Sequence, residues 1–502
     1  MLDRFFRLSE NKTTVRTEVL AGLTTFLTMA YIIFLQPMVL SGRMFGVPAE
    51  AEFMDFGAIT TATCVAAALA TVLMGVWARY PIALAPGMGE NFFFVFSVLP
   101  AAGTLAAVNS GATEPWQVAL GVVFIAGILF VLLSVLGVQV KLLEAISPSM
   151  RNAIAVGIGL FIAFIGLQNA SLVLKDPGTG VKLNPDFASP DLIVFFFGLL
   201  LTAGLHALHV RGSIVWGIVA ATVLSLVLLY GMGEPPPGAP PGPASGSAAE
   251  SEGAAGGETA AAPPSKLATG FRHAVDDLKA QGPISLPPSM APTFFRMDLV
   301  NALSLSMVPF VLIFLFMDVF DTLGTLIGVS EQAGFIRDDK LPRMKEALVS
   351  DAVGTAAGAA FGTSTVTSFI ESAAGVEQGG RTGLTGVVVA LLFLLALFFS
   401  PLIEMVGNYP PITAPALVVV GSMMMRNVTK IDWSNYAESM PAFLILAGIP
   451  LTYSIGDGLA LGFISYPIIK LCAGQGRDVK WLMYVMGVVL AAYLVFVRAQ
   501  AG

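Results

Sequence analysis

The chain has 502 residues, of which 56% are hydrophobic and only 12% are charged. A soluble domain carries roughly twice that charged fraction, so the composition excludes a soluble globular protein and indicates a protein that crosses a membrane several times. The formal net charge of −7 matters less than where the charges lie.

The sequence lacks the usual parts of a metal hydrolase or an ATP-driven pump. It has three histidines and no HExxH, CxxC or GxxxxGK[ST] motif. Cys64 and Cys472 both lie in apolar segments, where packing explains them better than a disulfide or a metal site. We therefore expect no enzyme activity, no metal and no cofactor. The N-terminus is polar and charged, so we also expect no cleaved signal peptide.

The first half of the chain begins with a basic segment, residues 1–17, and continues with seven apolar segments. They lie at about 18–42, 56–78, 84–99, 116–136, 149–173, 190–208 and 212–231. Most are long enough to span a hydrocarbon core of roughly 30 Å. The third is too short, and Pro86, Gly87 and Gly89 at its start predict a broken helix.

Residues 232–297 differ in kind from the segments on either side. Pro-, Gly- and Ala-rich sequence fills most of this stretch and cannot bury a core. We predict a low-complexity linker between two halves, with a short amphipathic piece at Phe271 to Leu278 that lies on the membrane surface.

The second half resumes at about 298–328 and holds further apolar segments to about 498. Three pairs of stretches resemble each other across the linker: Thr61–Phe96 with Asp351–Glu377, Pro148–Ile165 with Pro411–Val428, and Ile193–Val219 with Ala442–Ile464. A unit of seven segments repeated in tandem must be inverted in the membrane, which is a transporter architecture. The helix at 480–498 falls outside this repeat.

The positive charges predict the orientation, because cytoplasmic loops carry an excess of Lys and Arg. A cytoplasmic N-terminus places 18 of the 26 Lys and Arg residues inside. They are Arg4, Arg7, Lys12, Arg16, Arg79, Lys141, Arg151, Arg211, Arg337, Lys340, Arg343, Lys345, Arg381, Arg426, Lys430, Lys470, Arg477 and Lys480. The linker then lies outside the cell or in the periplasm.

Three carboxylates lie in apolar surroundings in the second half. Asp318 and Asp321 are three residues apart on an apolar helix, so they share a face, and Glu371 follows the Thr/Ser-rich run that starts at Gly362. Charges at membrane depth are expensive and usually functional. Asp351 is weaker, because capping of a helix N-terminus explains it, and Glu90 is expected to face a loop or partner helix.

The two broken segments predict a ligand site. Half-helices that start near 87 and 367 would point their N-terminal ends at one midplane point, as in inverted-repeat transporters. This point gathers carboxylates, hydroxyls, the amide of Asn91 and phenyl rings, but no Lys or Arg. A flat neutral ligand with N–H donors suits these groups better than an anion. Phe369, or a Phe of 92–94, can stack on its face.

The same carboxylates suggest the coupling ion. With no cation to balance three buried carboxylates, desolvation and repulsion favour protonation of at least one of them. We place this proton on the Asp321/Glu371 pair, without choosing between the two. H⁺ is therefore the expected coupling ion, and Na⁺ remains an alternative.

Several motifs resemble one family in the right order. They are Arg16-Thr-Glu-Val-Leu-Ala-Gly-Leu-Thr-Thr-Phe-Leu-Thr-Met-Ala-Tyr31-Ile, Ala85-Pro-Gly-Met-Gly89 with Asn91, Asp318 with Asp321-Thr-Leu-Gly-Thr, and Gly462-Phe-Ile-Ser-Tyr466. Together they resemble the AzgA-like purine permeases, transporters of adenine, guanine and hypoxanthine in the nucleobase–cation symporter-2 group. The resemblance covers the chain except for 232–297.

This resemblance implies an all-α polytopic fold: a UraA-like 7+7 inverted repeat with 14 transmembrane segments and short antiparallel strands in broken segments 3 and 10. Residues 18–136 and 298–406 would form a core domain, and 137–231 and 407–502 a gate domain, with the C-terminal helix attached to the latter. Substrate would bind in the core and move by an elevator-like displacement against the gate. We also expect the protein to lie in the cell membrane and to form a homodimer through the gate domain. We expect no nucleic-acid partner.

The resemblance also assigns roles to single residues. It implies purine contacts from Asn91, Asp318 and Glu371, a transport-critical role for Asp321 and a specificity role for Gly89. The uracil-type relatives have a Glu and a His in segment 8, where this chain has aspartates and no histidine. This departure argues against uracil as the substrate.

Three other functions fit the sequence less well. A cation channel would use acidic pore rings, but broken helices lined with hydroxyls and aromatic rings suit an occluded ligand better. An anion exchanger can share this fold, yet it would need a basic residue near the half-helix ends, and the sequence has none there. A membrane-embedded enzyme lacks a nucleophile–base pair at depth.

Overall fold

Helices make up most of this protein in a computed structural model, which describes residues 2–45, 47, 51–137, 146–176, 178–231, 267–335 and 341–498. Ten of the described helices are long and apolar enough to cross a membrane. Two shorter apolar helices, Tyr436–Thr452 and Trp481–Val495, follow the same pattern. The mostly helical membrane fold is therefore confirmed, with ten candidate spans found where the family resemblance implies 14.

The helices divide into two bundles by the contacts they make. The first bundle contains α2 (Val15–Met29), α3 (Ile32–Ser41), α4 (Phe56–Leu73), α5 (Met88–Phe93), α8 (Pro115–Leu136), α15 (Val308–Ala333), α16 (Met344–Phe361), α17 (Ser372–Glu377) and α18 (Gly383–Ala396). The second contains α10 (Pro148–Asn169), α11 (Pro190–Ala207), α12 (Ser213–Gly231), α20 (Pro410–Met424), α21 (Tyr436–Thr452), α22 (Ile455–Cys472) and α23 (Trp481–Ala492). Contacts within each bundle far outnumber those between the two.

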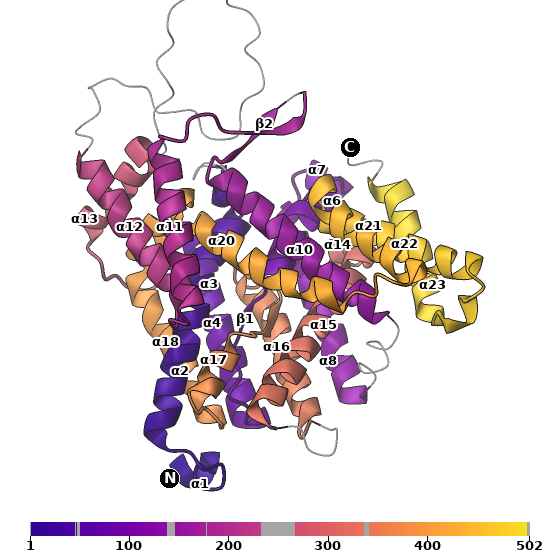
Figure 1. The fold of residues 1–502 in the computed structure, drawn as a ribbon, viewed down its shortest axis with the longest axis horizontal. Helices are drawn as coiled ribbons and strands as arrows, with labels where there is room; N and C mark the ends of the chain where they lie inside the picture. The colour runs from indigo at the N-terminus through magenta and orange to yellow at the C-terminus, as the bar shows by residue number, and fades with distance from the viewer. Residues whose placement is uncertain are drawn as a thin grey trace, which may run out of the picture.

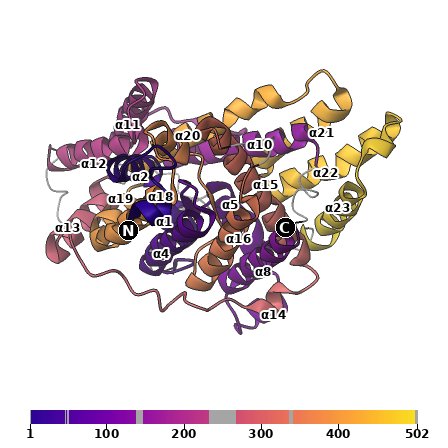
Figure 2. The ribbon, with the colours of Figure 1, turned by 90° about the horizontal axis from the view of Figure 1, so that it is seen from below.

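The second bundle is elongated and lies along one side of the first. Figure 1 shows α10 and α20 crossing the middle of the molecule, between α11 and α12 at one end and α22 and α23 at the other. Seen from below, the same helices form one row, and α4, α16 and α8 all lie on one side of this row (Figure 2). A short hairpin, β2 (Val173–Asp176) and β3 (Gly180–Leu183), extends from the end opposite the N-terminus (Figure 1).

Polar caps and prolines fix where these helices begin. Ser147 accepts a hydrogen bond from the backbone N–H of Met150 at 3.2 Å, and Pro148 occupies the first turn of α10. Gly137, with a φ of 71°, ends α8 in the left-handed conformation that favours glycine.

Close glycine contacts join α10 to α20, the pair whose sequences resemble each other. A Cβ built on Gly421 would lie 2.4 Å from the carbonyl oxygen of Gly159, so no side chain fits at this crossing. Small residues let two helix backbones approach within a membrane, where packing rather than the hydrophobic effect drives association.

Both broken segments have the predicted form. Pro86 ends strand β1 (Leu84–Pro86), which leads through Gly87 into α5, and strand β4 (Val366–Ser368) leads into α17. The two strands pair antiparallel, with Leu84 opposite Ser368 and Pro86 opposite Val366. The short antiparallel strands in segments 3 and 10 are therefore confirmed.

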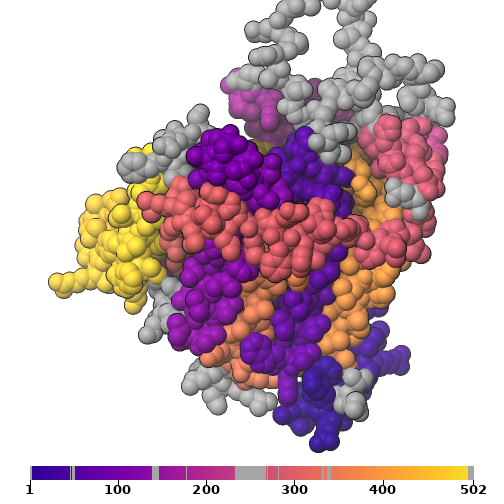
Figure 3. All heavy atoms as spheres, turned by 180° about the vertical axis from the view of Figure 1, so that it is seen from behind, coloured from indigo at the N-terminus to yellow at the C-terminus, as the bar shows by residue number. Residues whose placement is uncertain are grey.

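The second part of the predicted linker is a folded strap rather than a free connection. Helix α13 (Arg272–Gln281) packs against α19 (Ser400–Gly407), and its Phe271 ring lies 5.2 Å from that of Tyr409. The chain then crosses the back of the first bundle over α4 and α8 (Figure 3). Four hydrogen bonds join it to the helices. Three backbone N–H groups donate to helix carbonyls: Ser285 to Phe398 (2.9 Å), Phe295 to Ala360 (2.8 Å) and Asp298 to Gln117 (2.8 Å). The carbonyl of Pro288 accepts from Thr61 Oγ1 at 2.8 Å.

Apolar burial explains why the strap folds where a linker was predicted. Leu267, Phe271, Ala274 and Val275 repeat at helical spacing, and all four are buried. The rest of the predicted linker, residues 232–266, lies outside the described residues.

Deletion of residues 235–264 is expected to leave transport nearly intact. Their composition offers nothing to bury, and the strap that starts at Leu267 remains. The segment Leu267–Phe271 contacts α12, so the two ends are close. The five residues left between Gly231 and Leu267 can extend over roughly 20 Å. Uptake is the measurement, with surface labelling to show that the shortened chain reaches the membrane. Loss of uptake at normal surface expression would contradict this expectation.

Candidate functional site

The β1–β4 pair forms the floor of the site, and one threonine from each half fixes it. The Thr71 hydroxyl of α4 bonds to the backbone N–H and carbonyl of Leu84, at 2.9 and 3.0 Å. Thr355 of α16 makes the same pair of bonds to Val366, at 3.1 and 3.0 Å. These four backbone groups face away from the partner strand, so the threonines satisfy them in a buried setting.

Asp318 lies beside this floor on α15. The residue is 2% exposed, and Oδ2 lies 2.7 Å from Thr355 Oγ1, whose single proton is shared between this oxygen and the carbonyl of Val366. The other oxygen, Oδ1, has no partner among the described residues. A buried acceptor without a donor costs roughly 1–3 kcal/mol, more when it is charged. A ligand that donates a hydrogen bond to this oxygen would recover that cost.

Asp351 is not a helix cap, and that interpretation is wrong. It lies in the interior of α16, fully buried, because the helix begins at Met344 rather than at this residue. Its Oδ1 accepts a hydrogen bond from Ser368 Oγ of β4 at 3.0 Å, and Oδ2 has no partner in the described chain. When both carboxylates are ionised, the negative charge of Asp351 repels that of Asp318. A carboxylate at this position belongs to the site.

Glu371 lies at the turn between β4 and α17. Its Oε1 accepts a hydrogen bond from the Tyr31 hydroxyl at 2.9 Å. Tyr31 is buried at the short break between α2 and α3, and this break directs the ring toward the site. Our sequence interpretation did not predict Tyr31 as a site residue. The only signal in the sequence was a polar residue within an apolar run.

Asp321 lies on the exposed side of α15, one turn after Asp318. Gly324 and Ile327 continue this exposed stripe at helical spacing. The charge of Asp321 acts on Glu371 and also on Asp318. The two aspartates predicted to share a face are therefore close, but Asp318 is enclosed whereas Asp321 is open.

Asn91 belongs to a closed polar ring with Gln36 and Ser364. Its Nδ2 donates to Gln36 Oε1, and its Oδ1 accepts from Ser364 Oγ. Gln36 Nε2 in turn donates to Ser364 Oγ at 3.1 Å and to Thr363 Oγ1 at 2.8 Å. An amide has two N–H donors and two acceptor lone pairs. Asn91 therefore keeps one lone pair, and its second N–H points to the Met88 sulfur at 3.8 Å, a weak acceptor that a ligand can replace.

Glu90 also belongs to the site, contrary to the expectation that it faces a loop or another helix. It is 3% exposed, and the charges of Asp318 and Asp321 act on it. A Cβ on Gly87 would meet Glu90 Oε2 at 2.2 Å, so the carboxylate folds back over the start of α5. The sequence signal was an acidic residue directly beside Asn91.

Gly89 marks the contact between the two bundles. A Cβ built there would lie 3.1 Å from Cγ2 of Ile158 on α10 and 3.8 Å from Cε of Met317 on α15. Such contact is tighter than side chains normally accept, so a larger residue would press the second bundle away from the site.

The aromatic residues near the site differ in their freedom. Phe92 and Phe93 are fully buried and pack on other rings, Phe92 on Phe161 at 6.0 Å and Phe93 on Phe314 at 4.8 Å. Phe369 is 6% exposed, and its backbone N–H bonds to Ala83 O at 3.0 Å. Of the rings predicted to stack on a ligand, Phe369 is the one beside Glu371.

The site therefore brings five carboxylates together with an amide, hydroxyls and a phenol. Within the described residues, no Lys or Arg forms an ion pair with any of these carboxylates. In the same part of the chain, no three His, Cys, Asp or Glu side chains are placed to hold a metal ion. Carboxylates without cations can accept hydrogen bonds from a neutral donor or take up protons.

Comparison with known proteins finds a family and relatives that match over most of the chain. The Permease family model (Xan_ur_permease) matches residues 16–461. The chain is 38% identical to the guanine/hypoxanthine permease PbuG of Bacillus subtilis (strain 168), over 98% of this chain and 99% of that protein. It is 36% identical to the adenine permease AdeP of Escherichia coli (strain K12), over 100% and 97%. Among solved structures, the transmembrane domain of the cyanobacterial bicarbonate transporter BicA shares the fold, with a TM-score of 0.52, 15% identity, and coverage of 90% of this chain and 97% of that one.

Proposed function

This chain belongs to the Permease family, and on that premise we propose that it imports purine nucleobases (hypoxanthine, adenine and guanine) as a secondary active transporter. It is a multi-pass membrane protein with ten candidate spans in its described part. The observation that carries the proposal is the carboxylate cluster on the β1–β4 floor, which has acceptors to spare and no cation among the described residues.

A purine base matches this set of groups. Its ring N–H and exocyclic NH₂ groups are donors, which suit the free oxygen of Asp318 and the carboxylate of Glu371. Its ring nitrogens and carbonyl are acceptors, which suit the N–H that Asn91 otherwise directs at the weakly accepting sulfur of Met88. Charge-assisted hydrogen bonds are roughly twice as strong as neutral ones. Competition of labelled hypoxanthine uptake by a panel of purines and pyrimidines tests the substrate class, and uracil is expected to compete poorly.

Replacement of Asn91 by Ala is expected to weaken purine binding on the order of ten-fold, because one buried hydrogen bond to the base is lost. Ser364→Ala is the matched control, since it removes the donor to Asn91 Oδ1 but keeps the amide. The affinity for hypoxanthine, from uptake competition, should fall much less in Ser364→Ala. Equal losses in both variants would show that Asn91 only supports the ring with Gln36.

The two bundles support an elevator mechanism. In this proposal the first bundle is the core domain, which carries the site, and the second is the gate domain. Few contacts join the two bundles, whereas α10 and α20 are locked together through Gly159 and Gly421. Gly89 lies on the surface between them, where the absence of a side chain leaves room for the core to slide past Ile158.

Proton symport is the proposed coupling. Asp321 is exposed on α15, so it can take up a proton from water, and its charge acts on Glu371, the other member of the pair. Protonation removes a negative charge from a cluster that has no ion-pair partner in the described residues. Na⁺ coupling is the alternative, and imposed gradients distinguish the two.

We further propose the cell membrane as the location, with a cytoplasmic N-terminus. Arg7, Arg79, Arg343 and Arg381 gather around one cavity at the end of the molecule that carries the N-terminus, as the positive-inside rule requires of a cytoplasmic face. Lys141, Arg337 and Lys340, counted in the same prediction, lie outside the described residues. A homodimer through the gate domain stays a prediction.

An anion exchanger is the alternative within the same fold, and a cation channel is the alternative from another class. The exchanger would need a cation near the strand pair. Arg381, the first basic residue after Glu371 in the sequence, instead donates to the carbonyls of Val376 and Gly380, at 2.8 and 3.0 Å. Bicarbonate or sulfate flux, or single-channel currents, from the purified chain would favour these alternatives.

A further inference from the structure

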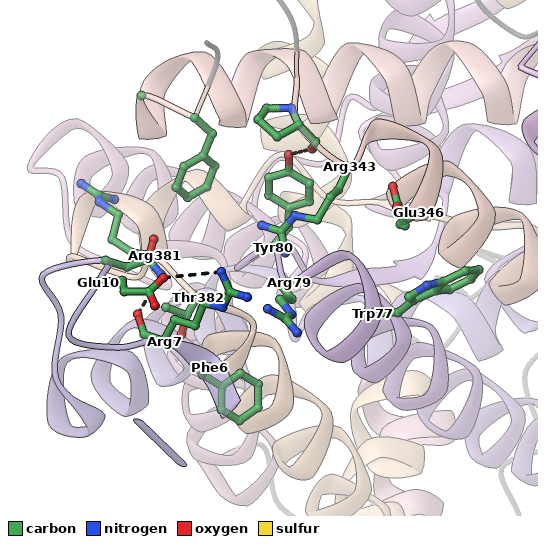
Figure 4. Close-up of a pocket in the computed structure, with 14 residues that line it drawn as sticks. Phe6, Arg7, Glu10, Trp77, Arg79, Tyr80, Arg343, Glu346, Arg381 and Thr382 are labelled. Carbon is green, nitrogen blue, oxygen red and sulfur yellow. Dashed lines mark hydrogen bonds and ion pairs between the residues drawn. The ribbon is translucent and has the colours of Figure 1, made fainter. Parts of the chain in front are cut away.

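A second site lies at the N-terminal end of the molecule, away from the carboxylate cluster. A cavity of about 480 Å³ opens there between four parts of the chain (Figure 4). They are the N-terminal segment around Phe6–Asn11, the end of the α4 segment at Trp77–Tyr80, the described residues next to the end of α15 and the start of α16, and the turn before α18. None of these residues contributes to the site above.

The walls of this cavity carry a surplus of positive charge. Arg7, Arg79, Arg343 and Arg381 line it, and Glu10 and Glu346 are the acidic residues among the described lining groups. Four positive and two negative charges leave a net charge of +2. Figure 4 shows the guanidinium groups of Arg7, Arg79 and Arg343 within the same space.

Two of these arginines have no ionic partner among the described residues. Arg7 pairs with Glu10 at 3.5 Å, and Arg381 donates to two backbone carbonyls. Arg79 and Arg343 form no ion pair with any described carboxylate, and Arg343 lies over the ring of Tyr80 at 5.6 Å. Their donors are therefore free to bind an anion.

The backbone holds three of the arginines in an uncommon conformation. Arg7, Arg79 and Arg343 have φ angles of 55°, 60° and 54°, in the left-handed region that side chains rarely adopt. Eight non-glycine residues of the described chain have positive φ, and three of them border this one cavity. Such conformations persist at functional sites, where the fold over-determines them.

Like charges held together favour a bound anion. Burial, together with the charges of Arg79 and Arg7, lowers the pKa of the Arg343 guanidinium. The positive-inside rule explains why arginines lie on this face, but it does not require them to converge on one cavity. A dianion would neutralise the net charge of +2.

The cavity is also larger than an inorganic ion needs. Its volume falls within the range of small-molecule sites, and the rings of Trp77, Tyr80 and Phe335 form part of its wall. Tyr80 and Phe335 lie 5.6 Å apart, centre to centre. We propose that this pocket binds a phosphate monoester, whose dianionic group the arginines hold while the aromatic side chains cover its organic part.

The phosphate can come from a soluble nucleotide or from a lipid headgroup, and one experiment separates the two. The full chain is placed in phosphatidylcholine nanodiscs, and its unfolding temperature is measured with adenosine 5′-monophosphate, with adenosine, or with phosphatidic acid added to the bilayer. Stabilisation by the nucleotide but not by adenosine supports a soluble ligand. Stabilisation by phosphatidic acid alone supports a lipid headgroup.

The variant Arg79→Gln/Arg343→Gln should lose this effect, with affinity for the probe reduced on the order of a hundred-fold, because two charge-assisted contacts are removed. Arg426→Gln, at an exposed arginine outside the cavity, is the matched control and should bind like the wild type. Purine uptake in phosphatidylcholine vesicles should be unchanged in both variants, so this proposal and the proposed transport function fail independently.

If the double variant does not fold, the proposal can still be tested on protein that keeps Arg79 and Arg343. Nucleotide binding should change the fluorescence of Trp77, and the change should disappear in Trp77→Phe. If neither probe stabilises the protein, or if the double variant folds and binds as well as the wild type, the proposal is overturned.

Discussion

Replacement of Glu371 by Gln is expected to nearly abolish purine uptake. The substitution keeps the shape of the side chain and an oxygen that can accept the hydrogen bond from Tyr31, but it removes the charge. The base would lose a charge-assisted hydrogen bond in a buried site, which lowers affinity on the order of ten- to a hundred-fold. Uptake of labelled hypoxanthine into cells or proteoliposomes measures the loss.

Two variants show whether the loss is specific to this carboxylate. Glu377→Gln removes an exposed charge from the same short helix and should transport like the wild type. Asp351→Asn should have a much smaller effect than Glu371→Gln, because the Asn oxygen can still accept from Ser368. If Glu371→Gln binds and transports like the wild type, the purine site lies elsewhere.

An inward proton gradient is expected to drive purine accumulation. A proton that enters with the neutral base adds roughly 2.3 kcal/mol per 100 mV of membrane potential, enough to concentrate the base about 50-fold. In proteoliposomes, acid outside should drive uptake of labelled hypoxanthine, a protonophore should abolish the accumulation, and Na⁺ should be dispensable.

Asp321→Asn should separate coupling from binding. Asp321 is exposed beside the cluster, and its loss should remove the response to the pH gradient while hypoxanthine still binds. Thr325→Ala, one turn further along the same helix, is the control and should keep the gradient response. Accumulation that follows an imposed Na⁺ gradient and ignores pH would contradict the proton assignment and leave the purine site standing.

The sequence determined the class of this protein and the position of its broken segments. A low charged fraction and long apolar runs have one physical outcome, helices in a membrane. Pro86 and the glycines after it cannot continue a helix, so the break before α5 could be read directly. Carboxylates within apolar runs are costly enough that Asp318, Asp321 and Glu371 stood out without any structure.

Only the tertiary structure showed which partners these carboxylates have. Asp351 was interpreted as a helix cap because sequence spacing does not fix where a helix begins to within a turn, and its contact with Ser368 joins residues of two separate elements. Tyr31 lies 340 positions before Glu371, and no local pattern connects the two.

The packing of the strap, residues 267–297, and the arginine pocket were hidden for the same reason. The sequence indicated an amphipathic piece at Phe271 to Leu278, but it did not show that its apolar residues are buried against the protein. The pocket joins arginines from four distant segments, each of which alone reads as an ordinary charge on a cytoplasmic loop. Local sequence fixes what each segment can form, whereas long-range packing decides which of the costly polar groups meet.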